Sequence, residues 1–300
     1  MILTSLPDLP PRPETAANAA FRRAFYERWG RENAIVCGTA REAEYATLAQ
    51  PLSIKLAWGG RERYVLADRE VVVDDDNWLV LNAGARYGSV LRAPRPAWSF
   101  AVFFRPGLVD ELRSLRRAAA GQALEQAMPA VPPRPFSQHL RRHDRRLTPR
   151  LRALRDAVLA GERDEDWLEI QLGALAEALL DAEAYERGTS DERPARATRD
   201  ELLRRLRRGA DFIESCATEP ITLQQMADAA CLSRCHFVRE FGRLFGRTPH
   251  DALCAKRAAL ARRAIATGEA DAERIAQAAG FGSRWSMRRA LARFPAPAAD

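Results

Sequence analysis

Hydrophobic and polar residues alternate along residues 34–104 in a way that predicts a β-rich domain. Over residues 52–58 the large apolar side chains fall on every second position, which is the period of a half-buried strand. Gly59 and Gly60 then favour a turn, and residues 63–67 resume the extended pattern, so we expect a hairpin here. Further strands are expected at residues 71–73, 78–82, 87–91 and 98–104. Short strands at this even spacing favour a barrel or a sandwich over alternating strands and helices.

The pattern becomes helical after Pro106. Thr148 and Pro149 are typical of an N-cap followed by a first helical position. Four leucines at helical spacing predict one face of a helix over residues 166–185, namely Leu168, Leu172, Leu175 and Leu179. Such a stripe is either a core face or a subunit interface. Because the segment lies between two predicted linkers, we expect a homodimer contact along the stripe.

Two breaks divide the chain. Residues 128–136 carry four prolines, too many for a helix or a central strand, and the polar residues 186–200 are typical of a linker. The predicted organisation comprises an N-terminal arm, a barrel, a helical segment for linkage and dimerisation, and a helical C-terminal domain (1–30, 31–127, 137–186 and 201–295). The fold class is therefore α+β and multidomain, with an N-terminal β-barrel, following helices and an all-α C-terminal domain.

Residues 221–248 have the pattern of a helix-turn-helix, in which two short helices are joined by a tight turn. Thr222 and Gln225 have the spacing of a capping box at the start of the first helix. Ser233 is a natural N-cap for the second helix, which is expected to end at Gly246. The second helix of such a motif can enter the major groove of DNA.

The same pattern returns about fifty residues later, where Ser283 corresponds to Ser233. Between the two copies, residues 250–267 predict one longer helix, which would separate the two units by about 27 Å along its axis. One turn of B-DNA is roughly 34 Å. Both second helices would therefore enter successive major grooves on one side of the duplex.

The charge of the chain supports a polyanionic partner. The formal net charge of the whole chain is +7. Residues 231–300 alone carry 13 basic and 6 acidic side chains, so the excess lies entirely in this C-terminal part. A confined basic excess points to nucleic acid or to an acidic membrane surface.

The residues from about 211 to 294 resemble the DNA-binding domain of the AraC/XylS family. The resemblance rests on Ile221, Thr222, Leu223, Ala227, Ala230, Ser233, His236, Phe237, Arg239, Phe241, Gly246, Arg247, Thr248, Pro249, Arg257, Gly280 and Phe281. The preceding strands and helices resemble the cupin-like effector-binding domain that often precedes it. The chain departs from the family in its ending, Phe294 and Pro295, and around Trp285.

The resemblance implies eight DNA-facing residues, which are Arg234, Cys235, Val238, Arg239, Arg284, Trp285, Arg288 and Arg289. Arg239 and Arg289 would bind guanine edges or clamp phosphate. The other three arginines are expected to contact phosphates, which fix register and carry little sequence information. Trp285 would contact a thymine methyl group or a sugar, while Cys235 and Val238 would read only shape and methyl groups.

Within the predicted barrel, four aromatic side chains are candidates for a mostly apolar effector pocket: Trp58, Tyr64, Trp78 and Tyr87. Since Trp58 shares the alternation of residues 52–58, we expect it to face the interior. The effector would be a small organic molecule. A filled core without a cavity is the alternative.

Other chemistries find little support. His139 and His143 have the spacing of a metal pair, but arginines surround them and no Glu completes an HExxH motif, so no metal and no cofactor are expected. The sequence shows no nucleophile motif, and we expect no enzymatic activity. The five cysteines lack CxxC spacing. No apolar run reaches the roughly 20 residues of a membrane span, so a cytoplasmic protein without membrane contact is expected.

These observations predict a sequence-specific transcription regulator that responds to an effector. Its expected partners are double-stranded promoter DNA, a small organic effector, a second copy of the chain, and RNA polymerase if it is an activator. An alternative is a cupin-like small-molecule-binding protein whose basic tail binds polyanions. A third option is a constitutive regulator whose barrel serves only as a dimer interface.

Overall fold

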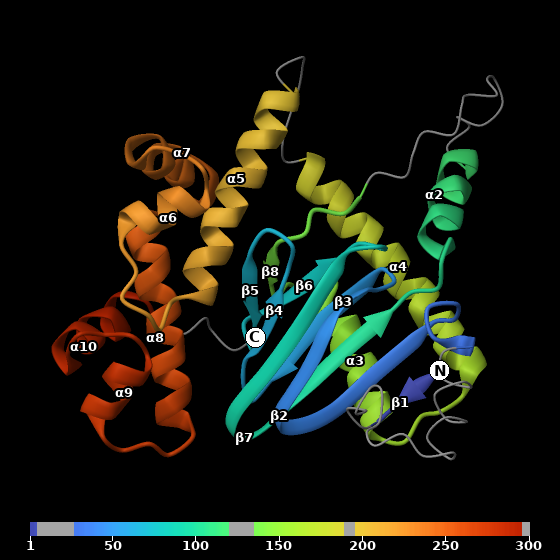
Figure 1. Ribbon diagram of the computed structural model, residues 1–300, viewed down its shortest axis with the longest axis horizontal. Coiled ribbons are helices and arrows are strands. Elements are labelled where there is room, and N and C mark those ends of the chain that lie inside the picture. The colour runs from blue at the N-terminus through green and yellow to red at the C-terminus, as the bar shows by residue number, and fades with distance from the viewer. Residues whose placement is uncertain (5–26, 120–134, 189–195, 296–300) are drawn as a thin grey trace. The chain divides into compact units, whose positions relative to one another are not determined.

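The computed structural model describes residues 1–4, 27–119, 135–188 and 196–295 (Figure 1). The chain divides into two compact units, Met1–Glu192 and Arg193–Asp300. A sheet with helices forms the first unit and helices alone form the described part of the second, which confirms the predicted α+β class. The predicted N-terminal arm and both predicted breaks lie partly outside the described residues.

The first unit is built on a sheet whose central strand is β7. The strands are β1 (Ile2–Leu3), β2 (Ala34–Ala49), β3 (Ser53–Trp58), β4 (Glu62–Val65), β5 (Glu70–Val73), β6 (Asn77–Leu81), β7 (Arg86–Phe103) and β8 (Leu140–Arg142). β2 pairs with β7 along most of its length. The other edge of β7 is shared by β3, near the end of β7, and by β4, near its start. The order β1-β2-β7-β3-β6-β8 does not close into a ring among the described strands.

The predicted hairpin of residues 52–67 is wrong, because β3 and β4 each pair with β7 and not with each other. Glycine is required at the connection. A Cβ atom added to Gly60 would lie 2.4 Å from the Cβ of Ala97, so only glycine allows the chain to approach β7 here. The segments 87–91 and 98–104, predicted as two strands, are one continuous strand. Its prolines, Pro94 and Pro96, fall at an irregularity in the pairing with β2, where no regular ladder is interrupted.

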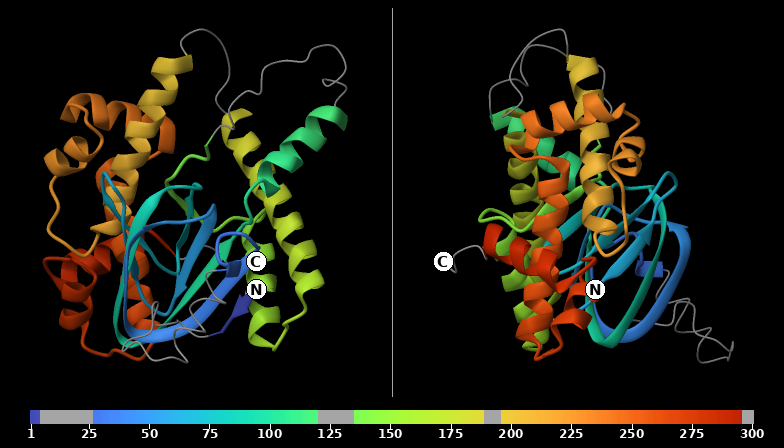
Figure 2. Two further views of the ribbon diagram at one scale, coloured as in Figure 1. Left: turned by 45° about the vertical axis from the view of Figure 1, so that its right-hand side comes forward. Right: turned by 90° about the vertical axis from the view of Figure 1, so that its left-hand side faces the viewer.

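Three helices accompany the sheet: α2 (Leu108–Ala119), α3 (Thr148–Leu159) and α4 (Glu165–Gly188). Figure 2 shows α3 and α4 along one face of the sheet. Pro149 lies in the first turn of α3 as expected, but Thr148 is the first helical residue and Leu147 occupies the N-cap position. The carboxylate of Asp144 accepts a hydrogen bond from the backbone N–H of Leu147 (2.8 Å) and so serves the start of the helix.

The leucine stripe of α4 belongs to the core of the first unit. Leu168, Leu172, Leu175 and Leu179 are each at most 2% exposed. They share one apolar cluster with Ile54, Leu56 and Phe100 of the sheet. The expected homodimer contact along this stripe is therefore wrong. The sequence pattern indicated that the face is buried, but the partner that buries it is the sheet of the same chain.

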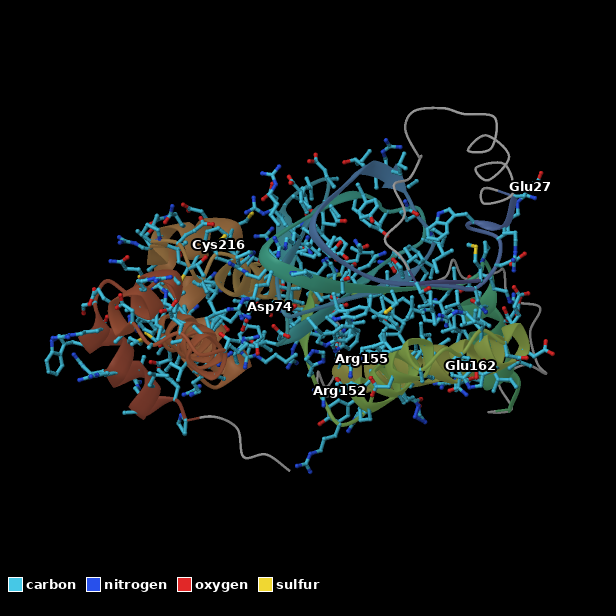
Figure 3. All side chains as sticks on the ribbon, turned by 90° about the horizontal axis from the view of Figure 1, so that it is seen from below. Glu27, Asp74, Arg152, Arg155, Glu162 and Cys216 are labelled. Atoms are coloured by element: carbon cyan, nitrogen blue, oxygen red, sulfur yellow. The ribbon has the colours of Figure 1, made fainter. Side chains whose placement is uncertain are left out.

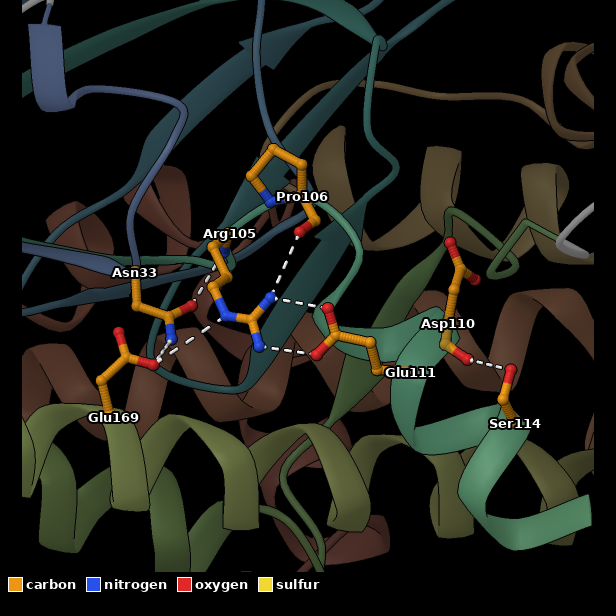
Figure 4. A network of polar contacts seen from close by, with 7 residues as sticks. All are labelled: Asn33, Arg105, Pro106, Asp110, Glu111, Ser114 and Glu169. Carbon is orange, nitrogen blue, oxygen red and sulfur yellow. Dashed lines mark hydrogen bonds and ion pairs between the residues drawn. The ribbon is translucent and has the colours of Figure 1, made fainter. Parts of the chain in front are cut away.

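A polar network joins the end of the sheet to α2 and α4 (Figure 4). Asn33 is fully buried, and its Nδ2 donates to Oε2 of Glu169 on α4 (2.9 Å). Its side-chain oxygen accepts from the backbone N–H of Arg105, immediately beyond β7 (2.8 Å). The Arg105 guanidinium in turn donates two hydrogen bonds to Glu111 of α2 (2.9 and 2.6 Å). One buried amide thus connects three segments that are far apart in the sequence.

The second unit contains α5 (Arg196–Ser215), α6 (Leu223–Ala229), α7 (Arg234–Phe245), α8 (Pro249–Ala266), α9 (Ala272–Ala278) and α10 (Arg284–Arg293). The pairs α6–α7 and α9–α10 are the two expected helix-turn-helix units, and α8 lies between them in the sequence. Helix α5 was not expected, and it begins inside the segment predicted as a linker. It contributes Leu206 and Ile213 to the core around Phe237 and Phe241 of the first helix-turn-helix unit.

Candidate nucleic-acid interface

Side-chain caps start each helix of the two helix-turn-helix units. At α6, the hydroxyl of Thr222 accepts from the backbone N–H of Gln225, and Oε1 of Gln225 accepts from the backbone N–H of Thr222 (3.2 and 2.8 Å). This confirms the capping box. Ser233 and Ser283 cap α7 and α10 in corresponding ways. Asp271 caps α9, a role that the sequence reading missed although an Asp before a helix is a known signal.

Helix α8 is fixed to the other helices by two cationic side chains. Arg257 donates from Nε to the carbonyl of Ala217 and from Nη2 to the carbonyl of Glu219, both at 2.7 Å. Lys256 is 1% exposed, and its Nζ lies 3.3 Å from Oε2 of Glu214 on α5. These contacts hold α8 against the end of α5 and the segment that precedes α6.

The eight residues expected to face DNA lie on the outer faces of α7 and α10. On α7, Phe237 and Phe241 are buried, while Arg234, Cys235 and Arg239 are exposed and Val238 is half-buried. On α10, Met287 and Ala290 are buried. The four expected residues there are all exposed: Arg284, Trp285, Arg288 and Arg289. The structure thus gathers four of the eight on each second helix, while their contacts with DNA stay predictions.

The two second helices differ in their electrostatics. On α7, Nε of Arg239 donates to Oε1 of Glu240 (2.8 Å), and Nη1 of Arg243 donates to the same oxygen (3.1 Å). Within the described residues, no carboxylate forms an ion pair with an arginine of the Arg284, Arg288 and Arg289 group on α10. The Arg288 guanidinium instead lies 5.8 Å from the centre of the Trp285 ring. Arg284, Arg288 and Arg289 are therefore available to an anionic partner without breaking an ion pair, whereas Arg293 at the end of α10 pairs with Asp251 (2.8 Å).

The four aromatic residues expected to share an effector pocket lie on two different faces of the sheet. Trp58 and Trp78 pack in the cluster that includes the leucines of α4, whereas Tyr64 and Tyr87 belong to a separate cluster. The Arg155 guanidinium of α3 lies 4.6 Å from the centre of the Trp58 ring (Figure 3 labels Arg155). The expectation of one pocket containing all four is wrong. Alternation shows which residues share a face, but it does not show which face a helix covers.

The face opposite α3 and α4, which we call the inner face, carries Ser53, Lys55, Ala57, Glu62, Tyr64 and Tyr87. Lys55 and Glu62 are 3% and 2% exposed. The Nζ atom of Lys55 lies 3.7 Å from the centre of the Phe103 ring. The hydroxyl groups of Ser53 and Tyr87 are 3.4 Å apart. Oε2 of Glu62 is buried without a hydrogen-bond partner in the described part of the chain.

Burial changes the acidity of the inner-face groups. It lowers the pKa of the Lys55 ammonium to about 7, although the neighbouring Glu62 carboxylate favours the charged form. Burial also raises the pKa of Tyr64 and Tyr87. The sequence reading missed Lys55 and Glu62. An available signal was Lys55 itself, a charged residue inside an otherwise apolar strand pattern.

Two further expectations concern sites of other kinds. Among the residues that the structure describes, no three His, Cys, Asp or Glu side chains gather as ligands of a metal ion. His139 and His143 lie immediately before and immediately after β8, not on a helix. None of the described helices combines the length and the apolar composition needed to cross a membrane.

Two helix-turn-helix units with arginine-bearing second helices define the class of the second unit, which is a DNA-binding domain. A family profile described as a helix-turn-helix domain matches residues 226–295. This domain is of the AraC type, and the protein is a DNA-binding transcription regulator.

Several solved structures are similar to the chain. ToxT from Vibrio cholerae is 10% identical with a TM-score of 0.34, over 88% of this chain and 95% of ToxT. The DNA-binding domain of AdpA in complex with a target DNA is 26% identical with a TM-score of 0.28, over 32% of this chain and 82% of that one. The C-terminal domain of the response regulator yesN from Fusobacterium nucleatum is 23% identical with a TM-score of 0.27, over 30% of this chain and 93% of that one. No curated protein matches the chain.

Proposed function

We propose that this regulator binds double-stranded promoter DNA with α7 and α10 in successive major grooves, and that its N-terminal unit binds a small organic effector. The observation that carries the DNA part is the duplicated, capped helix-turn-helix with exposed arginines on both second helices. Helix α8 has 18 residues and so spans about 27 Å, close to the roughly 34 Å of one turn of B-DNA. The proposal places the protein on chromosomal DNA in the cytoplasm.

Selection of bound fragments from genomic DNA tests the proposal. We expect one preferred duplex whose affinity exceeds that of random DNA by at least about 10³-fold at physiological salt. Binding to both should weaken as salt rises, because cationic contacts release counterions. A basic tail that only binds polyanions would weaken in the same way but would show no preferred duplex. That result would favour the alternative of a small-molecule-binding protein with a polyanion-binding tail.

The inner face supports the effector part of the proposal. A buried lysine and a buried carboxylate with an unpartnered oxygen are costly unless a polar group meets them. Together with the aromatic rings of Tyr64 and Tyr87, they would suit a small organic acid that also carries a hydroxyl or amino group. The acid would pair with Lys55, and the hydroxyl or amine would donate to Glu62.

Hydroxy acids and amino acids are therefore the effector classes to screen, by thermal shift and by DNA affinity. A tenfold change in DNA affinity requires about 1.4 kcal/mol of coupling between the two sites. We expect Lys55→Met to abolish the response and Trp58→Ala, on the other face, to retain it. Because the ammonium loses its proton as pH rises through about 7, effector affinity should fall over that range. A response that survives Lys55→Met and is lost in Trp58→Ala would contradict this placement.

A homodimer stays part of the proposal, but its interface must lie elsewhere than the leucine stripe of α4. RNA polymerase is a further partner if the regulator is an activator. The homodimer and the RNA polymerase contact both follow from the proposed regulator function alone, and none of the contacts described above bears on them.

A further inference from the structure

Glu240 lies in the middle of α7, beside two arginines and a histidine. Its side chain is 14% exposed, and its Oε1 lies 2.8 Å from Nε of Arg239 and 3.1 Å from Nη1 of Arg243. Nε2 of His236 lies 4.0 Å from the same oxygen. The hydrogen bond from Arg239, together with the charge of Arg243, lowers the pKa of the Glu240 carboxyl. A carboxylate therefore sits beside the one arginine of α7 that is expected to read a base.

The second helix-turn-helix unit has no equivalent of this carboxylate. When Ser283 is aligned with Ser233, Arg289 corresponds to Arg239 and the buried Ala290 corresponds to Glu240. Apart from its terminal residue Asp300, which lies outside the described residues, the chain has no acidic residue after Glu273. The two second helices, α7 and α10, thus both begin after a capping serine. They differ in that Arg239 is ion-paired, whereas Arg289 forms no ion pair within the described residues.

We propose that Glu240 competes with DNA for Arg239, and that it thereby lowers the affinity of the first helix-turn-helix unit for any duplex and sharpens its choice of sequence. The inference rests on the proposed DNA-binding function. Glu240 holds Nε of Arg239, so Arg239 gives up this bond when Nε turns toward a base or a phosphate. When Arg239 moves away, Glu240 keeps its ion pair with Arg243. The carboxylate therefore does not lose its last cationic partner, and the exchange is reversible.

The competition acts unequally on correct and incorrect DNA. At a guanine, Arg239 gains two parallel hydrogen bonds, which replace the lost ion pair fully. At a random sequence it gains a phosphate contact in a solvated groove, and Glu240 repels the same phosphate. Glu240 therefore costs more on random DNA than at the preferred site. On α10, Arg284, Arg288 and Arg289 are not held by carboxylates of the described chain, and the expected phosphate contacts of Arg284 and Arg288 supply binding that is independent of sequence.

The test uses Glu240→Gln in the full chain, which removes the charge and keeps the shape of the side chain. Fluorescence anisotropy with a random duplex and with the selected duplex, over a range of salt, gives both affinities and both salt slopes. We expect affinity for random DNA to rise about two- to fivefold, the range of one exposed ion pair. The salt slope on random DNA should steepen by about one, since one more arginine reaches phosphate. The gain on the selected duplex should be smaller.

Two controls separate competition for Arg239 from a general loss of negative charge. Asp228→Asn makes the same change of charge on α6, where Asp228 contacts Gln224 and no arginine in the described structure (2.7 Å). It should leave the random-DNA affinity nearly unchanged. In an Arg239→Ala background, Glu240→Gln should no longer increase affinity. Melting temperatures report folding, and Glu240→Ala, which reproduces the Ala290 side chain of α10, should behave as Glu240→Gln does.

Equal gains from Glu240→Gln and Asp228→Asn would overturn the inference, as would a full gain without Arg239. The random-duplex measurement does not require a preferred site. If selection finds no preferred duplex, the proposed regulator function fails while the competition between Glu240 and DNA is still decided.

Discussion

Alanine in place of Gly280 should destabilise the C-terminal unit strongly. Gly280 has φ +82°, and a Cβ atom at this position would lie 2.5 Å from the carbonyl oxygen of Ala217 and 2.8 Å from Cα of Thr218. Backbone strain of this kind costs about 1–3 kcal/mol. The contact with backbone atoms adds an overpacking cost of about 1–3 kcal/mol. Urea unfolding followed by circular dichroism should show the loss as an earlier transition of the helical unit.

Gly282→Ala is the matched control for that variant. Gly282 lies two positions further in the same turn, and an added Cβ would meet no atom within 4 Å. The free energy of unfolding of the Gly282→Ala variant should stay close to that of the unaltered protein. The Cβ added at Gly280 would also lie 3.0 Å from Nε of Arg257, which holds α8 to the carbonyls of Ala217 and Glu219. Gly280→Ala should therefore weaken this attachment of α8 and lower DNA affinity as well. Equal stability of the two variants would show that the turn relaxes more easily than this geometry indicates.

Loss of Arg288 and loss of Arg239 should affect DNA binding in different ways. Arg288→Ala is expected to weaken binding to all sequences similarly and to reduce the salt slope by about one, as for a phosphate contact. Arg239→Ala is expected to cost about 1–3 kcal/mol at the preferred site, as for a bidentate base contact. Affinities for the selected and random duplexes at several salt concentrations measure both effects.

Arg204→Ala serves as the control for charge alone, because Arg204 lies on α5 and pairs with Glu201 (2.6 Å). It should change neither affinity appreciably. If Arg239→Ala lowers binding to selected and random DNA by the same factor while the fold is intact, Arg239 contacts phosphate and does not read a base.

The two helix-turn-helix units were predictable almost to their caps because their signals are local, whereas α5 of the same unit was not expected. Thr222, Ser233 and Ser283 each accept from the backbone N–H three residues further along the chain, so their roles follow from spacing. Lys256 and Arg257 were not predictable in the same way. Their partners lie about forty residues away in the sequence, and no local pattern names them.

The N-terminal unit shows where a periodic pattern stops being informative. Residues 52–58 alternate as expected, but the face with Trp58 is covered by helices and the face with Lys55 is the inner one. Leu172 and its neighbours were recognised as a buried stripe, yet whether the same chain or a second copy buries such a stripe depends on tertiary packing. In both cases the missing information is which element packs on which face.

If both helix-turn-helix units bind one operator, as proposed, the length of α8 sets the spacing of the sequences that they contact. One residue added within this helix would turn everything beyond it by about 100° and advance it by about 1.5 Å. The arginines of α10 would then point away from the groove that follows the one occupied by α7. Relatives with a different operator spacing would have to change α8 by nearly whole turns, or unpair Lys256 from Glu214 and rebuild the junction. Under the proposed function, the length of α8 therefore determines the distance between the two DNA half-sites.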